Sequence, residues 1–357
     1  MTAQQTVLRP PRRPLVWWVA RPCRIAFCVL SISLVGCGPD VPPEVIVYTA
    51  LDREFSEPIF NRFTASTGII VRPKYDTEST KTVGLTQAIL AERERPRCDL
   101  FWNNEILNTL RLEREGLLRP HVSPAAQGFP AAMRSPEGTW SGFAARARVL
   151  IVNTNQVAEA RRPKSIRDLT DPQWYDRVAI AKPLFGTTAT HAACLFEAWG
   201  DEQAQTFLRA VKRNAKILAG NKQVARAVAS GALAFGLTDT DDAIIEVEAG
   251  MPVTIIYPDQ AEGELGTLFI PNTLALIKGS QHPEAAEQLV EWLLSAEVER
   301  LLADGPSAQI PLRPGVPASD RVKTPEQVRA MQVDFAAAAA KWDTAARFLQ
   351  VEFAAAD

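Results

Sequence analysis

Apolar and polar positions along the chain predict strands that are each followed by a helix. The run Glu44–Thr49 is typical of a strand, and the next apolar positions recur at helical spacing as far as Gly68. The same order returns twice more. These further elements are the strands Ile69–Pro73 and Cys98–Trp102 and the helices Thr82–Arg95 and Ile106–Glu115. Strands that alternate with helices of this length indicate a parallel α/β sheet.

A long strand signal over Phe143–Thr154 separates this first series from a second one. The second series contains strands at Val178–Ala181, Ala215–Leu218 and Ala232–Leu237 and a helix after Thr188. It is followed by a strand at Thr267–Ile270, a turn at Pro271-Asn272, a strand at Thr273–Ile277 and two long helices, Pro283–Ala303 and Pro325–Phe353. Two α/β series joined by long strands predict two lobes with a cleft between them. We place lobe 1 at residues 44–142 and 268–315, and lobe 2 at residues 143–267 and 316–357.

A polar turn rich in aspartate follows the apolar run Ala232–Leu237. Asp239, Asp241 and Asp242 lie within four residues, where the strand should end, and a helix can then run as far as Gly250. In open α/β sheets, ligands collect at the carboxyl ends of strands. Crowded carboxylates repel one another, and a bound cation or donor relieves that repulsion. Helix capping accounts for one or two of the acids as well, so a ligand site and a plain helix start both stay open.

The first forty residues differ from the rest of the chain. Five arginines and no acid precede an apolar run from Ile25 to Gly36, which is typical of a secretory signal and too short to span a membrane. The run ends in Leu-Val-Gly-Cys37, which resembles the lipobox of bacterial lipoproteins. The resemblance implies a signal peptide at residues 1–36, a lipidated Cys37, and a proline-rich linker that completes residues 37–43. The alternative is a chance cysteine behind a cleavable signal.

Charge and cysteine content narrow the class of protein. Removing residues 1–36 takes away five of 39 basic residues and none of 41 acidic ones, so 34 basic residues remain and the net charge is −7. A net negative chain argues against a nucleic-acid partner. Apart from Cys37, the mature chain keeps only Cys98 and Cys194, too few for a disulfide framework even in an oxidising compartment. We therefore expect two buried free thiols.

Seven segments, taken in order, carry a family resemblance over nearly the whole mature chain. They are Ile46–Thr49, Cys98–Glu105, Arg146–Asn153, Asp168–Pro172, Ala181–Thr188, His282–Ala286 and Trp292–Ser295. Their order and spacing resemble the ferric-iron branch of the family 1 extracellular solute-binding proteins. The resemblance implies a type II periplasmic-binding-protein fold, in which two α/β lobes close on a ligand in a central cleft. It also implies ABC permease and ATPase subunits as partners, and we expect a monomer that is lipid-anchored on the periplasmic side of the cell envelope.

This chain matches the fold of that family better than it matches the family's ligand residues. In ferric members, two adjacent tyrosines follow the strand that corresponds to Leu233–Leu237 and hold the metal, whereas the matching positions here carry Asp241 and Asp242. The chain has four tyrosines, none adjacent to another. The family's frequent histidine after the first strand is also missing, and Asp52 lies near its place. Glu105 matches the family's carboxylate ligand.

The candidate residues suit a charged ligand. Oxygen ligands from Glu105, Asp239, Asp241 and Asp242 suit a hard cation, although an acid cluster can equally hold an ammonium group. We therefore expect ferric iron or a similar metal as a transported ligand, with carbonate or phosphate beside it, and no tightly bound cofactor.

Other residues suit an anion. Arg146 and Arg148 are two apart on a strand, so both point to one face, and the arginine fork suits carboxylate or phosphate. The resemblance implies that the synergistic anion binds at this place. Thr187 and Thr188 follow Gly186 between a strand and a helix, where backbone N–H groups and hydroxyls can cradle an oxyanion. Pairing of the arginines with surface acids and plain capping by the threonines are the structural alternatives.

Two other functions stay open on the sequence. One is binding of a small anionic or zwitterionic organic solute, such as a phosphonate or a phosphate ester. The other is a lipoprotein that binds a protein partner. We do not expect an enzyme, because the three histidines lie in no metal-ligand spacing and no motif pairs a nucleophile with a base.

Overall fold

The computed structural model of the chain describes residues 11–15, 17, 42–76 and 82–354. The chain divides after Val41, and Pro42–Asp357 form one compact unit. The predicted signal-peptide cleavage site and Cys37 lie outside the described residues, so the signal peptide and lipid anchoring both stay predictions. Within the part of the chain that is described, no helix is long and apolar enough to cross a membrane.

Nine strands form one mixed sheet. Their order is β2-β1-β3-β9-β4-β7-β5-β6, and β8 pairs with β4 outside this path. The strands are β1 Glu44–Thr49, β2 Ile70–Tyr75, β3 Leu100–Asn103, β4 Ser141–Asn153, β5 Val178–Ala181, β6 Lys216–Leu218, β7 Phe235–Asp239, β8 Val253–Ile256 and β9 Phe269–Leu276. Parallel pairs join β1 to β2 and β3, and β5 to β6 and β7. The predicted α/β fold built from two series of strands is confirmed.

The long strand β4 belongs to both halves of the sheet. Its first part, Ser141–Ala147, pairs antiparallel with β9, and its second part, from Arg148 on, pairs antiparallel with β7 and β8. We call β1, β2, β3 and β9 with the first part of β4 the first half, and β5 to β8 with the second part the second half. The two halves correspond to the two expected lobes, but the residue boundaries of the lobes stay a prediction.

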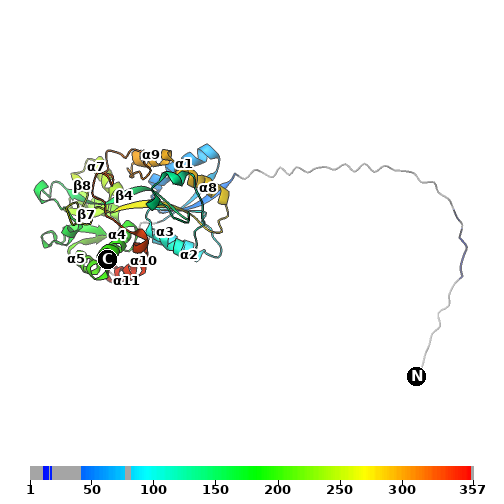
Figure 1. Cartoon of the computed structure of the whole chain (residues 1–357), viewed down its shortest axis with the longest axis horizontal. Coiled ribbons are helices and arrows are strands. Elements are labelled where there is room, and N and C mark those ends of the chain that lie inside the picture. The colour runs from blue at the N-terminus through cyan, green and yellow to red at the C-terminus, as the bar shows by residue number, and fades with distance from the viewer. Residues whose placement is uncertain (1–10, 16, 18–41, 77–81, 355–357) are drawn as a thin grey trace, which may run out of the picture. The chain divides into compact units, whose positions relative to one another are not determined.

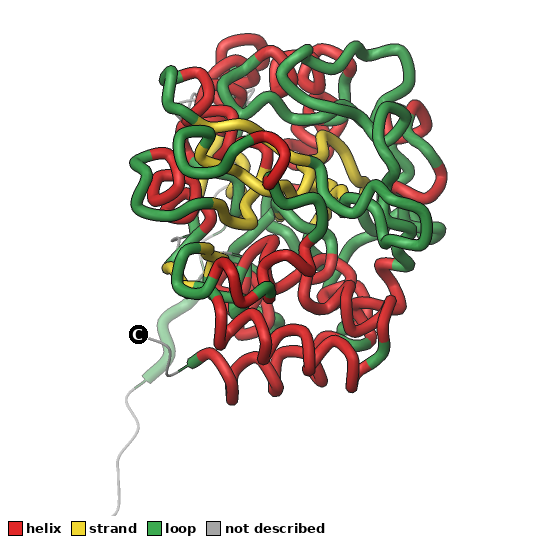
Figure 2. Tube along the Cα trace, turned by 90° about the vertical axis from the view of Figure 1, so that its left-hand side faces the viewer, coloured by secondary structure: helices red, strands yellow, loops and turns green. Residues whose placement is uncertain are grey.

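Helices cover both faces of the sheet (Figures 1 and 2). On one face lie α1 Arg53–Thr67, α8 Pro283–Leu293 and α9 Ala296–Asp304 over the first half, and α6 Asn221–Ala229 and α7 Thr240–Glu248 over the second. On the other face lie α2 Val83–Ala91, α3 Leu107–Arg114, α4 Gly186–Trp199, α5 Asp201–Asn214, α10 Phe335–Ala340 and α11 Trp342–Phe353. Their apolar core runs without a break under both halves, since α10 contacts both α3 and α4. Cys98 and Cys194 lie in this core as buried free thiols, as expected.

Two of the predicted helices were wrong in extent. The apolar stripe over Pro283–Ala303 is broken at Ser295, whose hydroxyl accepts the backbone N–H of Val298 and starts a second helix. In the C-terminal segment, helix begins only after Asp334, which caps α10 through the N–H groups of Ala336 and Ala337. A continuous apolar pattern does not reveal caps inside it.

The predicted turn at Pro271-Asn272 was also wrong. Both residues lie inside the continuous strand β9, where Pro271 faces Ala145. The register of β4 shifts between Phe143 and Ala145, so the proline sits beside a β-bulge, a position where a missing N–H is tolerated in a sheet.

Outside the cleft, Asp259 is a buried acid in the loop after β8. Its carboxylate accepts the Ser165 hydroxyl and the Ile166 N–H, and burial raises its pKa from the ordinary 3.8 to about 6. The folded protein therefore holds this proton more tightly than the unfolded chain. Stability from this residue is present below about pH 4 and is lost as pH rises through about 6, by up to about 3 kcal/mol.

We expect Asp259→Asn to remove this pH dependence. Asparagine keeps an acceptor for Ser165 and tolerates the backbone φ of 62° found there. The difference in unfolding free energy between the variant and the wild type, measured by urea denaturation, should therefore grow in favour of the variant between pH 4 and pH 7. The exposed change Asp320→Asn is the matched control. A constant difference between Asp259→Asn and the wild type over this range would contradict the assignment.

Candidate functional site

A small polar pocket lies beside β4, where the two halves of the sheet meet. Its lining comes from both halves and consists of Asp52, Asn104, Arg146, Ala181, Lys182, Phe185, Gly186, Thr187, Thr188, Ala219, Gly220, Asn221, Asp239, Asp241 and Asp242. The cavity volume is about 30 Å³. A single buried water needs about 10–15 Å³ on the same measure, so the space fits an ion with one small companion.

Three aspartates form one wall of the pocket. Asp239 is the last residue of β7 and the N-cap of α7, and Asp241 and Asp242 lie in the first turn of that helix. One carboxylate oxygen from each of the three lies within 4.8 Å of the others. Negative side chains are favoured at a helix N-terminus, which lowers the cost of bringing them together. The predicted aspartate cluster therefore exists at a strand end and lines a pocket.

Asp239 is held by several donors behind this wall. Arg148 donates to its Oδ1 at 2.6 Å, and Thr187 and Asn221 donate to its Oδ2 at 2.6 and 2.9 Å. The Arg148 guanidinium is fully buried and also donates to the hydroxyls of Thr187 and Thr188. Burial alone would raise the pKa of Asp239, but the nearby arginines, Arg148 first, hold it below its usual range. Asp239 is thus a charged scaffold that fixes β7 against the start of α4.

Arg146 faces a different aspartate. Its Nη1 lies 3.3 Å from Asp241 Oδ2, and its Nη2 lies 3.5 Å from Asn272 Oδ1 on β9. Burial alone would lower the pKa of this guanidinium, but the carboxylates around it, Asp241 first, raise it above its ordinary value. Arg146 therefore stays charged on the strand that both halves share, with one edge toward the pocket.

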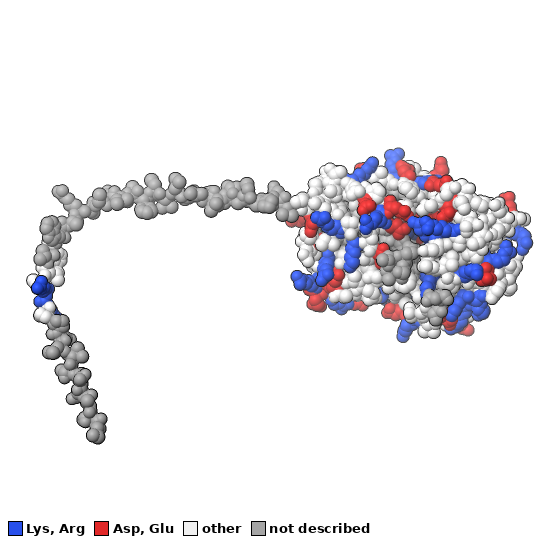
Figure 3. Space-filling model, turned by 180° about the vertical axis from the view of Figure 1, so that it is seen from behind, with Lys and Arg blue, Asp and Glu red and all other residues white. Residues whose placement is uncertain are grey.

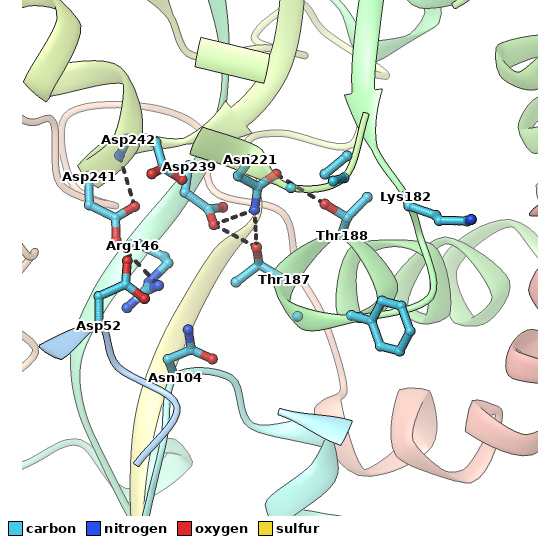
Figure 4. Close-up of a pocket in the computed structure, with 15 residues that line it drawn as sticks. Asp52, Asn104, Arg146, Lys182, Thr187, Thr188, Asn221, Asp239, Asp241 and Asp242 are labelled. Atoms are coloured by element: carbon cyan, nitrogen blue, oxygen red, sulfur yellow. Dashed lines mark hydrogen bonds and ion pairs between the residues drawn. The ribbon is translucent and has the colours of Figure 1, made fainter. Parts of the chain in front are cut away.

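The wall opposite the aspartates begins at the N-terminus of α4. Thr187 and Thr188 lie in its first turn, and Lys182 and Asn221 lie beside them (Figure 4). Asn221 is the first residue of α6, which packs closely on β7 at Gly236, where a β-carbon would lie only 2.4 Å from Val224. Backbone N–H groups at a helix start provide a site for an anion, whereas the Lys182 amine points away from the aspartates and donates to Ala354 O at 3.3 Å.

The first half of the sheet supplies Asp52 and Asn104. Asp52 follows β1 and Asn104 follows β3, and both face the aspartate wall across the pocket (Figure 4). Asn104 is 1% exposed, and its Oδ1 has no hydrogen-bond partner among the described residues. An unsatisfied buried carbonyl costs free energy, so the Asn104 side chain, which lines the polar pocket, is a candidate ligand for a cation or a donor.

Glu105 points elsewhere. It is fully buried but does not line the pocket, and its carboxylate accepts from the backbone N–H groups of Leu107 and Asn108 at the start of α3. Its oxygens also accept from Asn103 and Thr190. The position after β3 that reaches the pocket is one residue earlier, at Asn104.

The structure thus brings most of the predicted residues to one place. Asp52, Arg146, Thr187, Thr188, Asp239, Asp241 and Asp242 line the pocket, Arg148 supports it from behind, and Glu105 lies outside it. Sequence reasoning missed Asn104, Lys182 and Asn221. The sequence feature that could have identified these residues is their position directly after a predicted strand or at the start of a helix.

Comparison with known proteins finds the same architecture. A family model described as bacterial extracellular solute-binding protein matches residues 107–341. The major ferric iron-binding protein of Neisseria meningitidis is 25% identical over 316 residues, which cover 87% of this chain and 92% of the relative.

Two solved structures have similar folds. Iron-bound HitA from Pseudomonas aeruginosa is 25% identical, with a TM-score of 0.79 over 86% of this chain and 99% of the other. AfuA from Actinobacillus pleuropneumoniae, with fructose-6-phosphate bound, is 19% identical, with a TM-score of 0.78 over 88% and 99% of the two chains. One fold therefore accommodates both iron and a sugar phosphate as ligands.

Proposed function

Because the chain belongs to the bacterial extracellular solute-binding protein family, we propose that it captures ferric iron with a small anion and delivers the iron to an ABC importer. Relatives named for ferric iron support this cargo, among them the ferric iron-binding protein of Neisseria meningitidis. The protein acts as a binding protein rather than an enzyme.

The observation that carries the proposal is a pocket of about 30 Å³ walled by carboxylates. Carboxylate and amide oxygens are ligands that hard cations prefer. We assign Asp241 and Asp242 as ligands from the second half of the sheet, and Asp52 and Asn104 as ligands from the first. Such a set bridges both lobes, so a bound cation would hold them together.

The anion would lie at the start of α4. Thr187 and Thr188 lie opposite the aspartates there, and Arg146 stands between the two walls. Carbonate or phosphate in this place would complete the coordination of a trivalent cation and balance the charge of Arg146. Asp239 and Arg148 would hold the two walls in position without contacting the cation.

We expect ferric ion plus carbonate or phosphate to raise the melting temperature of soluble protein beginning at Gly38 by about 5 °C at a hundredfold excess over Kd. Among the described residues no tyrosine lines the pocket, so the complex should lack the strong visible absorption of tyrosinate–iron bonds. Native mass spectrometry with elemental analysis would identify retained metal. If ferric ion with either anion causes no thermal shift, this cargo is wrong.

A second candidate cargo is a small zwitterionic solute, such as an aminophosphonate. The observation in its favour is the pairing of an anion site at α4 with an acid wall that could hold an ammonium group. A thermal shift with aminophosphonates or phosphate esters, and none with ferric ion, would establish this cargo instead.

We further propose a location on the periplasmic side of the envelope, with Cys37 lipidated and the chain monomeric. Basic and acidic side chains are mixed over the face seen in Figure 3, which suits neither nucleic acid nor direct binding to an anionic membrane. Contact with the membrane would then come through the lipid alone.

A further inference from the structure

Glu105 is a buried carboxylate that the pocket does not use. Three of its hydrogen bonds come from its own half of the molecule, namely from Asn103 Nδ2 at 2.9 Å, the Leu107 N–H at 2.7 Å and the Asn108 N–H at 3.0 Å. These donors fix the carboxylate at the N-terminus of α3, where a negative charge is favoured. The Glu105 carboxylate is therefore held in position whether or not the second half of the molecule contacts it.

The fourth hydrogen bond crosses between the halves. Thr190 Oγ1 donates to Glu105 Oε2 at 2.8 Å, and Thr190 lies in α4, which follows β5 of the second half. Both residues are fully buried. A hydrogen bond to a buried charge is worth more than one between neutral groups, because the charge strengthens it and no water competes.

Two parts of the pocket are joined by this bond. Asn104 directly precedes Glu105, and the first turn of α4, with Thr187 and Thr188, directly precedes Thr190. The Glu105–Thr190 bond therefore sets the distance between the oxygen ligand of the first half and the anion-binding turn of the second.

Besides the apolar core that runs under both halves, an ion pair joins them at the rim. Lys222 of α6 donates to Glu54 of α1 at 2.7 Å, and both side chains are partly exposed. An exposed ion pair of this kind contributes little to stability. Of these two polar contacts, the buried Glu105–Thr190 bond is therefore the stronger and the more dependent on geometry.

We propose that Glu105 and Thr190 form a latch that selects the closed arrangement of the lobes and sets Asn104 against the start of α4. Glu105 acts through Asn104 and is a positioning residue rather than a ligand. The affinity part of this inference rests on the proposed function, whereas the conformational part does not.

The latch can be tested with Thr190→Val, which removes the hydroxyl and keeps the shape. We expect ferric affinity, measured with carbonate present, to fall about 10-fold through faster dissociation. Thr190→Ser restores the donor and should restore affinity. Thr86→Val is the matched control, because its buried hydroxyl donates to Thr82 O within the first half alone.

A second readout does not depend on cargo. Spin labels on cysteines placed at the exposed Glu94 and Arg213 report the distance between the halves by pulsed electron resonance, since the native Cys98 and Cys194 are buried. We expect Thr190→Val to increase the long-distance population relative to the wild type and to Thr86→Val.

The two readouts separate the possible failures. If the wild type does not bind ferric ion, the proposed function fails, and the distance distributions still test the latch. Identical distributions for the wild type and Thr190→Val, with and without ferric ion, would overturn the latch. An equal shift of the distance distribution in Thr86→Val would indicate a general structural effect and would also count against the latch.

Discussion

Asp239→Ala is expected to destabilise the protein by about 3–5 kcal/mol, the cost of leaving one member of a buried ion pair without its partner. Arg148 has no exposed surface, and its shortest contact is the 2.6 Å bond to Asp239. Without the carboxylate, Thr187 and Asn221 also lose an acceptor. Chemical denaturation followed by circular dichroism measures the loss.

A double variant separates the ion pair from general packing. Replacing Arg148 by Met and Asp239 by Leu removes both charges, so we expect the double variant to recover part of the stability that Asp239→Ala loses. A single variant that loses less than about 1 kcal/mol would show that the pair contributes little, as exposed ion pairs do.

Asp241→Ala is expected to weaken ferric binding by about 2 kcal/mol or more, which is about 30-fold, while the fold stays intact. Asp241 lies only two residues from Asp239, but its oxygens line the pocket and it faces Arg146 rather than the Arg148 scaffold. Isothermal titration with ferric ion and carbonate measures affinity, and melting temperature reports the fold. Glu246→Ala on the same helix, outside the pocket lining, is the matched control.

Arg146→Ala provides the companion test. We expect a similar loss of affinity, because the variant removes a cationic contact for the anion from a desolvated site. Unchanged affinity in both Asp241→Ala and Arg146→Ala would refute the assignment of this pocket as the cargo site.

The aspartate wall was predictable because it depends on chain order alone. An apolar run followed by several acids places them at a strand end, and a strand end in an α/β sheet is where pockets form. The arginines on β4 were predictable for the same reason. Their separate roles were not, because only the register between β4 and β7 places Arg148 opposite Asp239.

The choice between Asn104 and Glu105 could not be made from the sequence. Both follow β3, and a charged residue is the more obvious ligand for a cation. Strand β3 ends at Asn103, and the Glu105 carboxylate accepts a backbone N–H at the start of α3. The neutral residue between them, Asn104, therefore lines the pocket. Side-chain direction past a strand end depends on tertiary contacts that no local pattern encodes.

The position of β9 has a consequence for synthesis. This strand lies between β3 and β4 in the sheet, although it follows both in the chain by more than a hundred residues. A growing chain therefore cannot complete the first half of the sheet until residue 276 has left the ribosome. Such late closure slows folding, because the pairs that β9 makes with β3 and β4 join segments far apart in the chain.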